Sequence, residues 1–174
     1  MTQEDNPRST ALANLALAGR NFPLRRAEVS DVGPIVELIA RDQLRAPVES
    51  ADLQDRAPYL AAFQAIAADP AHLLCVADSP DGVLVATMQL TFLPGLARRG
   101  ALRMQIEALR VDASLRGHGL GSAMIRWAVA EASRRGAALV QLTSDNTRHD
   151  AHRFYERLGF VQSHAGFKLA LPKG

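Results

Sequence analysis

The spacing of apolar residues changes along this chain, and the change predicts where helices and strands lie. Apolar positions fall three to four residues apart over Val32–Ile39 and again over residues 50–68, which is the spacing of amphipathic helices. Elsewhere apolar and polar residues alternate, as they do in half-buried strands. The predicted strands are a first one over 22–27 and, after the helices, a meander of three over 72–77, 83–92 and 101–111.

The third strand of this meander changes phase partway along. Met104 and Ile106 alternate with polar residues up to Glu107, but Leu109 and Val111 are apolar in the opposite phase. A period of two that changes parity implies one inserted residue, so we expect a β-bulge near 107–109. A bulge bends the strand and releases backbone N–H and C=O groups from the ladder.

A glycine-rich turn follows this strand. Gly117, Gly119 and Gly121 lie within five residues, directly before a helical stripe predicted over Leu120–Arg135. A turn of this kind directs backbone N–H groups and the positive end of the helix dipole at one point, which suits a phosphate group. No lysine lies near enough for a Walker loop, and the spacing differs from the dinucleotide fingerprint. The remaining pattern is R-x-x-G-x-G, formed by Arg116, Gly119 and Gly121.

A second motif lies nearer the C-terminal end. After a short apolar strand predicted over 138–143, a helix is predicted over 147–158, ended by Gly159. Its sequence reads A-x-x-F-Y-x-x-x-G-F, from Ala151 to Phe160. The alternation over Phe167–Leu171 predicts a last strand.

Composition excludes several classes of protein. The 174 residues carry a net charge of only +2, with 7 basic and 12 acidic side chains before residue 96 and 13 basic and 6 acidic ones after it. A basic half that contains the glycine-rich turn suits a polyanionic ligand, whereas no lysine-rich run favours nucleic acid. The single cysteine, Cys75, excludes a disulfide framework and reads as a buried thiol in an apolar run. The histidines lack metal-ligand spacing with further partners, so we expect no metal site.

Residues 1–21 read as an N-terminal tail or a short helix, and no segment is apolar over the length of a membrane span. We therefore expect a cytoplasmic protein without membrane partners.

Together the two motifs resemble those of the GNAT superfamily of N-acetyltransferases, and they cover roughly residues 100–160 in the expected order. The resemblance implies an α/β protein with a mixed, mostly antiparallel sheet, a splayed central strand pair and helices on both faces. One domain would extend over 22–174. The implied activity is acetyl transfer from acetyl-CoA to a primary amine, by direct attack in a ternary complex. The alternative is a CoA-binding sensor or interaction module that has lost turnover.

The resemblance also implies roles for particular residues. Tyr155 would be the general acid that protonates the CoA sulfur, and Glu107, on the polar phase at the bulge, would be the general base. The alternative for Glu107 is a structural ion pair with a nearby arginine. Either Asn146 or Arg148 would contact the cofactor where the family often has an asparagine. Backbone groups of the strand and the turn would hold CoA, at Leu109, Val111, Arg116, Gly117, His118, Gly119, Leu120, Gly121 and Ser122.

The acceptor amine is not identified by these motifs, so small amines and protein amines both stay open. The predicted helix pair carries the acidic residues Asp42, Glu49, Asp52 and Asp55. They form either a solvated surface or a wall of the acceptor site that attracts a cationic amine. A homodimer would cover exposed edge strands.

Overall fold

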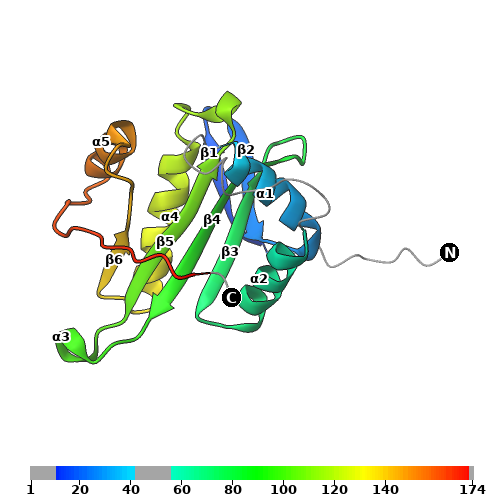
Figure 1. Cartoon of the computed structure of the whole chain (residues 1–174). Coiled ribbons are helices and arrows are strands. Elements are labelled where there is room, and N and C mark those ends of the chain that lie inside the picture. Colours follow the sequence, from blue (N-terminus) through cyan, green and yellow to red (C-terminus); the bar gives the residue numbers. More distant parts are fainter. Residues whose placement is uncertain (1–10, 42–55, 173–174) are drawn as a thin grey trace. The chain divides into compact units, whose positions relative to one another are not determined.

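The computed structural model of the chain describes residues 11–41 and 56–172. Contacts between residues divide the chain after Gln141 into two compact units, and each is described by itself. Six strands form one sheet in the order β1-β2-β3-β4-β5-β6, and the first five pair with antiparallel neighbours (Figure 1). Their bounds are β1 Ala11–Leu17, β2 Arg20–Arg26, β3 His72–Asp78, β4 Leu84–Leu93, β5 Arg103–Val111 and β6 Leu139–Leu142. The predicted fold class and strand meander are confirmed.

The first strand corrects the prediction for the N-terminal residues. Residues 11–17 were expected in a tail or short helix, but they form β1, which pairs along its length with β2. Ala18 and Gly19 connect the two strands with φ angles of 47° and 76°, the left-handed values of a two-residue hairpin turn. Alanine and leucine favour helix locally, yet this tight turn holds the segment against β2, where backbone pairing and burial of Leu15 favour the strand.

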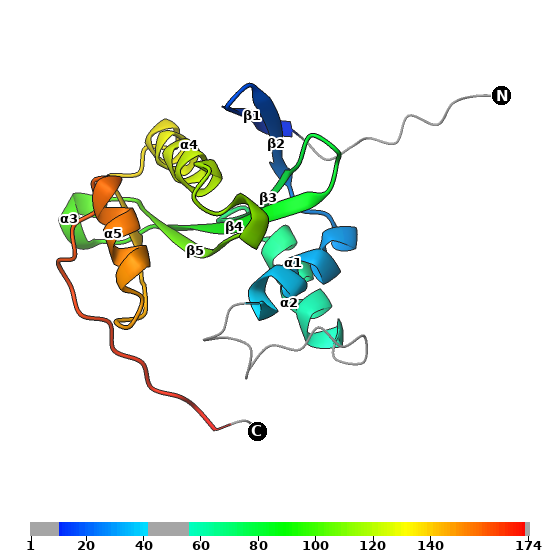
Figure 2. The same cartoon turned by 90° about the horizontal axis from the view of Figure 1, so that it is seen from above.

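Helices cover both faces of the sheet in the first unit. Helix α4 (Leu120–Arg134) contacts β1, β4 and β5, whereas α1 (Val32–Ala40) and α2 (Arg56–Ala68) pack on the opposite face (Figure 2). The guanidinium of Arg135, just after α4, lies over the ring of Phe92 at 4.4 Å from its centroid, which fixes the face that α4 covers. That face is apolar throughout, with Leu73, Met88, Leu90 and Met104 completely buried. A short helix, α3 (Ala97–Gly100), lies in the exposed connection between β4 and β5.

The predicted β-bulge is present in β5. Thr87 pairs with Arg110 and Gln89 pairs with Glu107, so Met88 alone faces both Ala108 and Leu109. Ala108 has a φ of 50°, as the first residue of such a bulge can have. The extra residue restores the phase of the strand, so Leu109 and Val111 lie on the same face as the apolar residues before the bulge.

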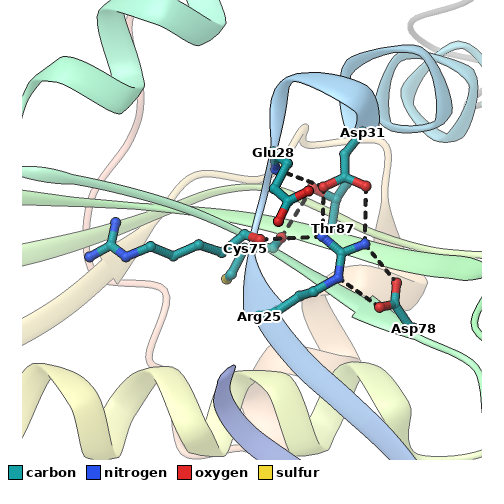
Figure 3. A network of polar contacts seen from close by, with 7 residues as sticks. Arg25, Glu28, Asp31, Cys75, Asp78 and Thr87 are labelled. Carbon is teal, nitrogen blue, oxygen red and sulfur yellow. Dashed lines mark hydrogen bonds and ion pairs between the residues drawn. The ribbon is translucent and has the colours of Figure 1, made fainter. Parts of the chain in front are cut away.

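A polar cluster joins the first strands to α1 (Figure 3). The guanidinium of Arg25 on β2 donates to both carboxylate oxygens of Asp31, at 2.7 and 3.0 Å, and of Asp78, at 2.7 and 3.1 Å. Asp31 ends the single 3-10 turn Val29–Asp31 and also accepts the backbone N–H of Glu28 at 2.7 Å. These contacts raise the pKa of Arg25, and the hydrogen bonds that it donates to Asp31 are the largest cause. The cluster fixes where α1 leaves the sheet.

The second unit contains α5 (His149–Arg157). Gly159, at a φ of 90°, ends it in a Schellman motif, in which the N–H of Phe160 bonds to the C=O of Tyr155 at 3.1 Å. The predicted last strand is wrong: residues 160–172 form neither helix nor strand, and Phe167, Leu169 and Leu171 are 79–95% exposed. Alternation alone does not make a strand, because a strand also needs a neighbouring edge to which it can bond.

Candidate active site

The glycine-rich turn forms a cradle of backbone amides at the start of α4. Gly117 and Gly119 have φ angles of 78° and 92°, and Gly119 is the residue at which the helix begins. The first helical hydrogen bond runs from the N–H of Ala123 to the C=O of Gly119, so the amides of Leu120, Gly121 and Ser122 precede it. A Cβ at Gly117 would meet open space, so the backbone is accessible there. The geometry fits an anion such as a pyrophosphate.

Two side chains of this turn form hydrogen bonds with nearby backbone carbonyls. The Nε of Arg116 donates to the carbonyl of Val111 at 3.2 Å, and the Nδ1 of His118 lies 2.9 Å from the carbonyl of Arg116. The turn is therefore held to the end of β5 by its own residues.

Asp112, the residue between β5 and the turn, is a further support that the motif did not reveal. Its Oδ1 accepts the backbone N–H of Ser114 at 3.0 Å and the hydroxyl at 2.7 Å, and its Oδ2 accepts from Arg41 at 2.9 Å. The bond from the Ser114 hydroxyl is the largest cause of a lowered pKa at Asp112. The Asp-x-Ser spacing could have indicated the local cap, but Arg41 lies too far away in sequence to be linked to it.

The strand before the turn presents the bulge. Leu109 and Val111 are half-buried. The carbonyl of Leu109 accepts from the Nη1 of Arg110 at 2.8 Å, as that of Val111 accepts from Arg116. The resemblance assigns backbone groups of both residues to the cofactor, and in this structure the carbonyl of each bonds to an arginine side chain.

Glu107 is exposed at the bulge, on the sheet face opposite α4. Its Oε1 accepts from the side-chain amide of Gln105 at 3.0 Å. No arginine among residues 11–41 and 56–172 forms an ion pair with it, and both predicted roles of Glu107, as a base or as a structural group, stay open. The first unit thus brings Glu107, Leu109, Val111 and the turn onto one strand and its direct continuation.

Tyr155 and Asn146 belong to the second unit. Tyr155 is half-buried on α5, and its ring packs edge to face against Phe154 and Phe160, with centroids 5.1 and 5.9 Å away. Asn146 is exposed in the turn before α5, whereas Arg148 is half-buried at the start of that helix. The sequence alone left Asn146 and Arg148 as alternatives, and both stay so.

The single cysteine lies in the apolar core and not at the site. Cys75 is completely buried, its thiol donates to the carbonyl of Met88 at 3.2 Å, and burial raises its pKa to about 12, as expected of a structural thiol.

Across the described ranges there is no group of three or more His, Cys, Asp or Glu side chains arranged to hold a metal ion. None of the helices described is long and apolar enough to cross a membrane. Asp42, Glu49, Asp52 and Asp55 lie outside the described residues.

A bulged strand that leads through an amide cradle into a helix, within a mostly antiparallel sheet, is the arrangement that the resemblance to the N-acetyltransferases implied. Residues 36–160, most of the chain, match the Acetyltransferase (GNAT) family. The chain belongs to this family, whose members use acetyl-CoA, and the predicted resemblance is confirmed.

Three similar proteins illustrate how far the likeness extends. The chain is 45% identical over 67 residues to an aminoalkylphosphonate N-acetyltransferase of Salmonella typhimurium, a match that covers 38% of this chain but only 44% of that protein. It is 30% identical over 170 residues to glucosamine 6-phosphate N-acetyltransferase 1 of rice, Oryza sativa subsp. japonica, covering 95% and 98% of the two chains. The crystal structure of a transcriptional regulator from Bacillus halodurans is 37% identical, with a TM-score of 0.82 and coverage of 86% and 99%.

Proposed function

We propose that this chain transfers the acetyl group of acetyl-CoA to a primary amine, by direct attack of the amine in a ternary complex. The observation that carries the proposal is the continuity of β5 with the amide cradle. The bulge releases backbone groups of β5 beside the place where an anion would bind, so one extended ligand could lie along the strand and end in the turn. Family membership favours this activity over the alternative of a non-catalytic CoA-binding module.

The amide cradle would bind the pyrophosphate of CoA. The amides of Gly117 to Ser122 need no particular side chain for this, and glycine permits the close approach of the backbone. The pantetheine arm would bond to backbone groups of Leu109 and Val111. A bond from the pantetheine arm to the carbonyl of Leu109 or Val111 would replace the bond that Arg110 or Arg116 makes to that carbonyl in this structure. Asn146 or Arg148 would add one further contact.

The chemistry needs a neutral amine, a stabilised oxyanion and a protonated leaving group. Glu107 would accept a proton from the ammonium form of the acceptor. The neutral amine nitrogen then forms the bond to the thioester carbon, and the carbon–sulfur bond breaks with its electron pair on sulfur. Tyr155 would donate its phenolic proton to the departing sulfur, since a phenol with a usual pKa near 10 stays protonated at neutral pH. The nitrogen gives up its second proton to solvent as the amide forms, and solvent later returns a proton to the phenolate of Tyr155.

The proposed acceptor is a small cationic amine. The acidic residues Asp42, Glu49, Asp52 and Asp55, close in sequence to α1 and α2, would attract a positive charge. The names of two relatives, an aminoalkylphosphonate and a glucosamine 6-phosphate N-acetyltransferase, support a small amino compound over a protein. Both compounds also carry an anionic phosphonate or phosphate, so the names support the small size of the acceptor, and its positive charge rests on the four carboxylates alone. Replacing the four carboxylates together should raise the KM for the amine and leave the affinity for CoA unchanged.

The cofactor site is tested by calorimetry with acetyl-CoA. Gly119→Asp places a carboxylate in the cradle and should abolish binding. Gly119→Ala is the matched control, because it introduces the same strain at a φ of 92° without the charge. A Cβ there meets only Leu17, at 3.6 Å, so the alanine variant should fold and retain measurable affinity. If the aspartate variant binds acetyl-CoA as tightly as the alanine variant does, the cradle is not the anion site.

The chemical roles are tested by pH–rate profiles with one good amine. Tyr155→Phe keeps the ring packing and should lower turnover by roughly 10²–10⁴-fold, with acetyl-CoA binding intact. Glu107→Gln should lose most activity near neutral pH and regain it as pH rises toward the pKa of the amine itself. An unchanged profile for Glu107→Gln would exclude the carboxylate as the base, and full turnover of Tyr155→Phe would exclude the phenol as the acid.

A further inference from the structure

A chain of side-chain hydrogen bonds runs along the sheet and ends on Glu107. The Nε2 of Gln141 on β6 donates to the Oε1 of Gln105 on β5 at 2.9 Å. The Nε2 of Gln105 then donates to the Oε1 of Glu107 at 3.0 Å. Two residues, one from each of the last two strands, are therefore linked to the carboxylate.

These residues belong to a polar zone on the sheet face opposite α4. Strand register places Gln105 beside Thr91 and Glu107 beside Gln89, and the Nδ1 of His72 on β3 lies 3.1 Å from the hydroxyl of Thr91. The other face of the same strands is completely apolar. The amides and the carboxylate of this zone are half-buried or exposed, and the hydrogen bonds link Gln141, Gln105 and Glu107 into one arrangement.

The donor-to-acceptor direction of this series of hydrogen bonds follows from the chemistry of the amide group. A glutamine side chain has one oxygen that accepts and one nitrogen that donates. Because Gln141 donates to the oxygen of Gln105, the nitrogen of Gln105 is turned toward Glu107. An ionised carboxylate can only accept, so it is the nitrogen of Gln105, and not its oxygen, that bonds to Glu107.

We propose that Gln105 and Gln141 are positioning residues for Glu107, holding its carboxylate in one orientation for the transfer of a proton from the acceptor amine. This inference rests on the proposed role of Glu107 as the base. With Oε1 bonded to Gln105, Oε2 is the oxygen that accepts the proton. Neither glutamine touches the substrate. Gln105 acts on the carboxylate, and Gln141 acts through Gln105 by fixing which way its amide points.

Other charged groups share this face and belong in the interpretation of any pH profile. Arg103 and Arg110 on β5 and His72 on β3 lie on it by register. On the same side, α1 carries Glu37 and is followed directly by Arg41, and α2 carries Arg56 and Tyr59. His72→Gln is included as a background variant, because histidine is the side-chain type that changes charge between about pH 5 and 8.

The test is a set of pH–rate profiles on the full chain. Gln105→Glu keeps the shape of the side chain but places a second carboxylate against Glu107, which disfavours the ionised base. The acid limb of the profile should move up by on the order of one pH unit. Gln105→Met removes the donor at similar volume and should lower kcat on the order of tenfold, with the KM for acetyl-CoA unchanged. Gln141→Met should change kcat in the same direction by less, and the exposed Gln64→Met on α2 is the matched control for this type of substitution.

The outcomes separate this inference from the proposed function. If Glu107→Gln removes the acid limb but Gln105→Glu leaves it where it was in the parent, the positioning role is wrong and the base assignment stands. If Glu107→Gln itself has the parent profile, the base assignment fails first. A purely structural role for Gln105 predicts a lower melting temperature with no movement of the limb, and that result also overturns the proposal. In the double variant Gln105→Glu with Glu107→Gln, the shift should disappear.

Discussion

At the scale of single residues, Ala108 is the unusual position of β5. It is one of four residues other than glycine with a positive φ in the described ranges, and the others lie in turns or in the exposed connection at α3. An L-amino acid in the left-handed region costs about 1–2 kcal/mol. The left-handed conformation of Ala108 lets two residues of β5 lie opposite Met88 alone. As a result, Leu109 lies on the same apolar sheet face as Met104 and Ile106.

Substitutions at Ala108 should reveal that strain. Ala108→Gly relieves it at the cost of a more flexible unfolded chain, so the free energy of unfolding should rise by up to about 1 kcal/mol. Ala108→Val adds a β-branched side chain to a left-handed backbone and should lower it by about 1–2 kcal/mol. Urea denaturation of the two variants measures both effects. Equal destabilisation by glycine and valine would mean that the position is not strained in solution.

At the scale of elements, the Arg25 cluster holds β2, β3 and the start of α1 together. One guanidinium satisfies two carboxylates, and the side chains of Arg25, Asp31 and Asp78 are only 21, 10 and 14% exposed. Removing one partner of a shielded ion pair lowers the free energy of unfolding much more than removing one partner of an exposed pair. The reason is that the remaining charge stays shielded from water without a partner to compensate it.

Arg25→Met should therefore lower the free energy of unfolding by about 3 kcal/mol, since two carboxylates lose their cation. Arg134→Met is the control: Arg134 also bonds to a carboxylate, on Glu131, but its side chain is 70% exposed, so solvent screens the pair and its loss should change stability little. Thermal or urea denaturation compares them directly. Similar losses for the two variants would contradict a shielded cluster at Arg25.

At the scale of the whole molecule, several carboxylates have a lowered pKa in the folded state. The largest cause is a side-chain hydrogen bond from Ser114 at Asp112, from Arg134 at Glu131 and from Thr147 at Asp145. A group whose pKa is lower when folded adds stability above its unfolded pKa, near 4 for these side chains, and that stability is lost as pH falls through the folded value.

The free energy of unfolding should accordingly fall as the pH drops below about 4. Asp112→Asn keeps a side-chain oxygen for Ser114 but removes the charge, so the decline should be shallower in this variant. Asp81→Asn, an exposed position in the turn between β3 and β4, is the control. Urea midpoints measured between about pH 2 and 6 give the slopes. If Asp112→Asn and the parent show the same slope, Asp112 does not carry this stability.

The sequence by itself determined the elements whose signal is local. The period of apolar residues located α1, the meander β3 to β5 and α4, and a change of parity located the bulge to within a residue. The same local signals located the glycine-rich turn and the motif around Tyr155, because glycine positions and motif spacing are readable without knowing what packs against them.

Only the tertiary structure decided which segments find partners. Ala11–Leu17 became a strand because β2 offers it an edge, whereas Phe167–Leu171 has the alternation of a strand but makes no ladder. The bonds from Gln141 to Gln105 and from Arg41 to Asp112 join residues 36 and 71 positions apart. No local pattern encodes such contacts, since the free energy of a hydrogen bond or an ion pair depends on which groups the fold brings together and on how much water it excludes from them.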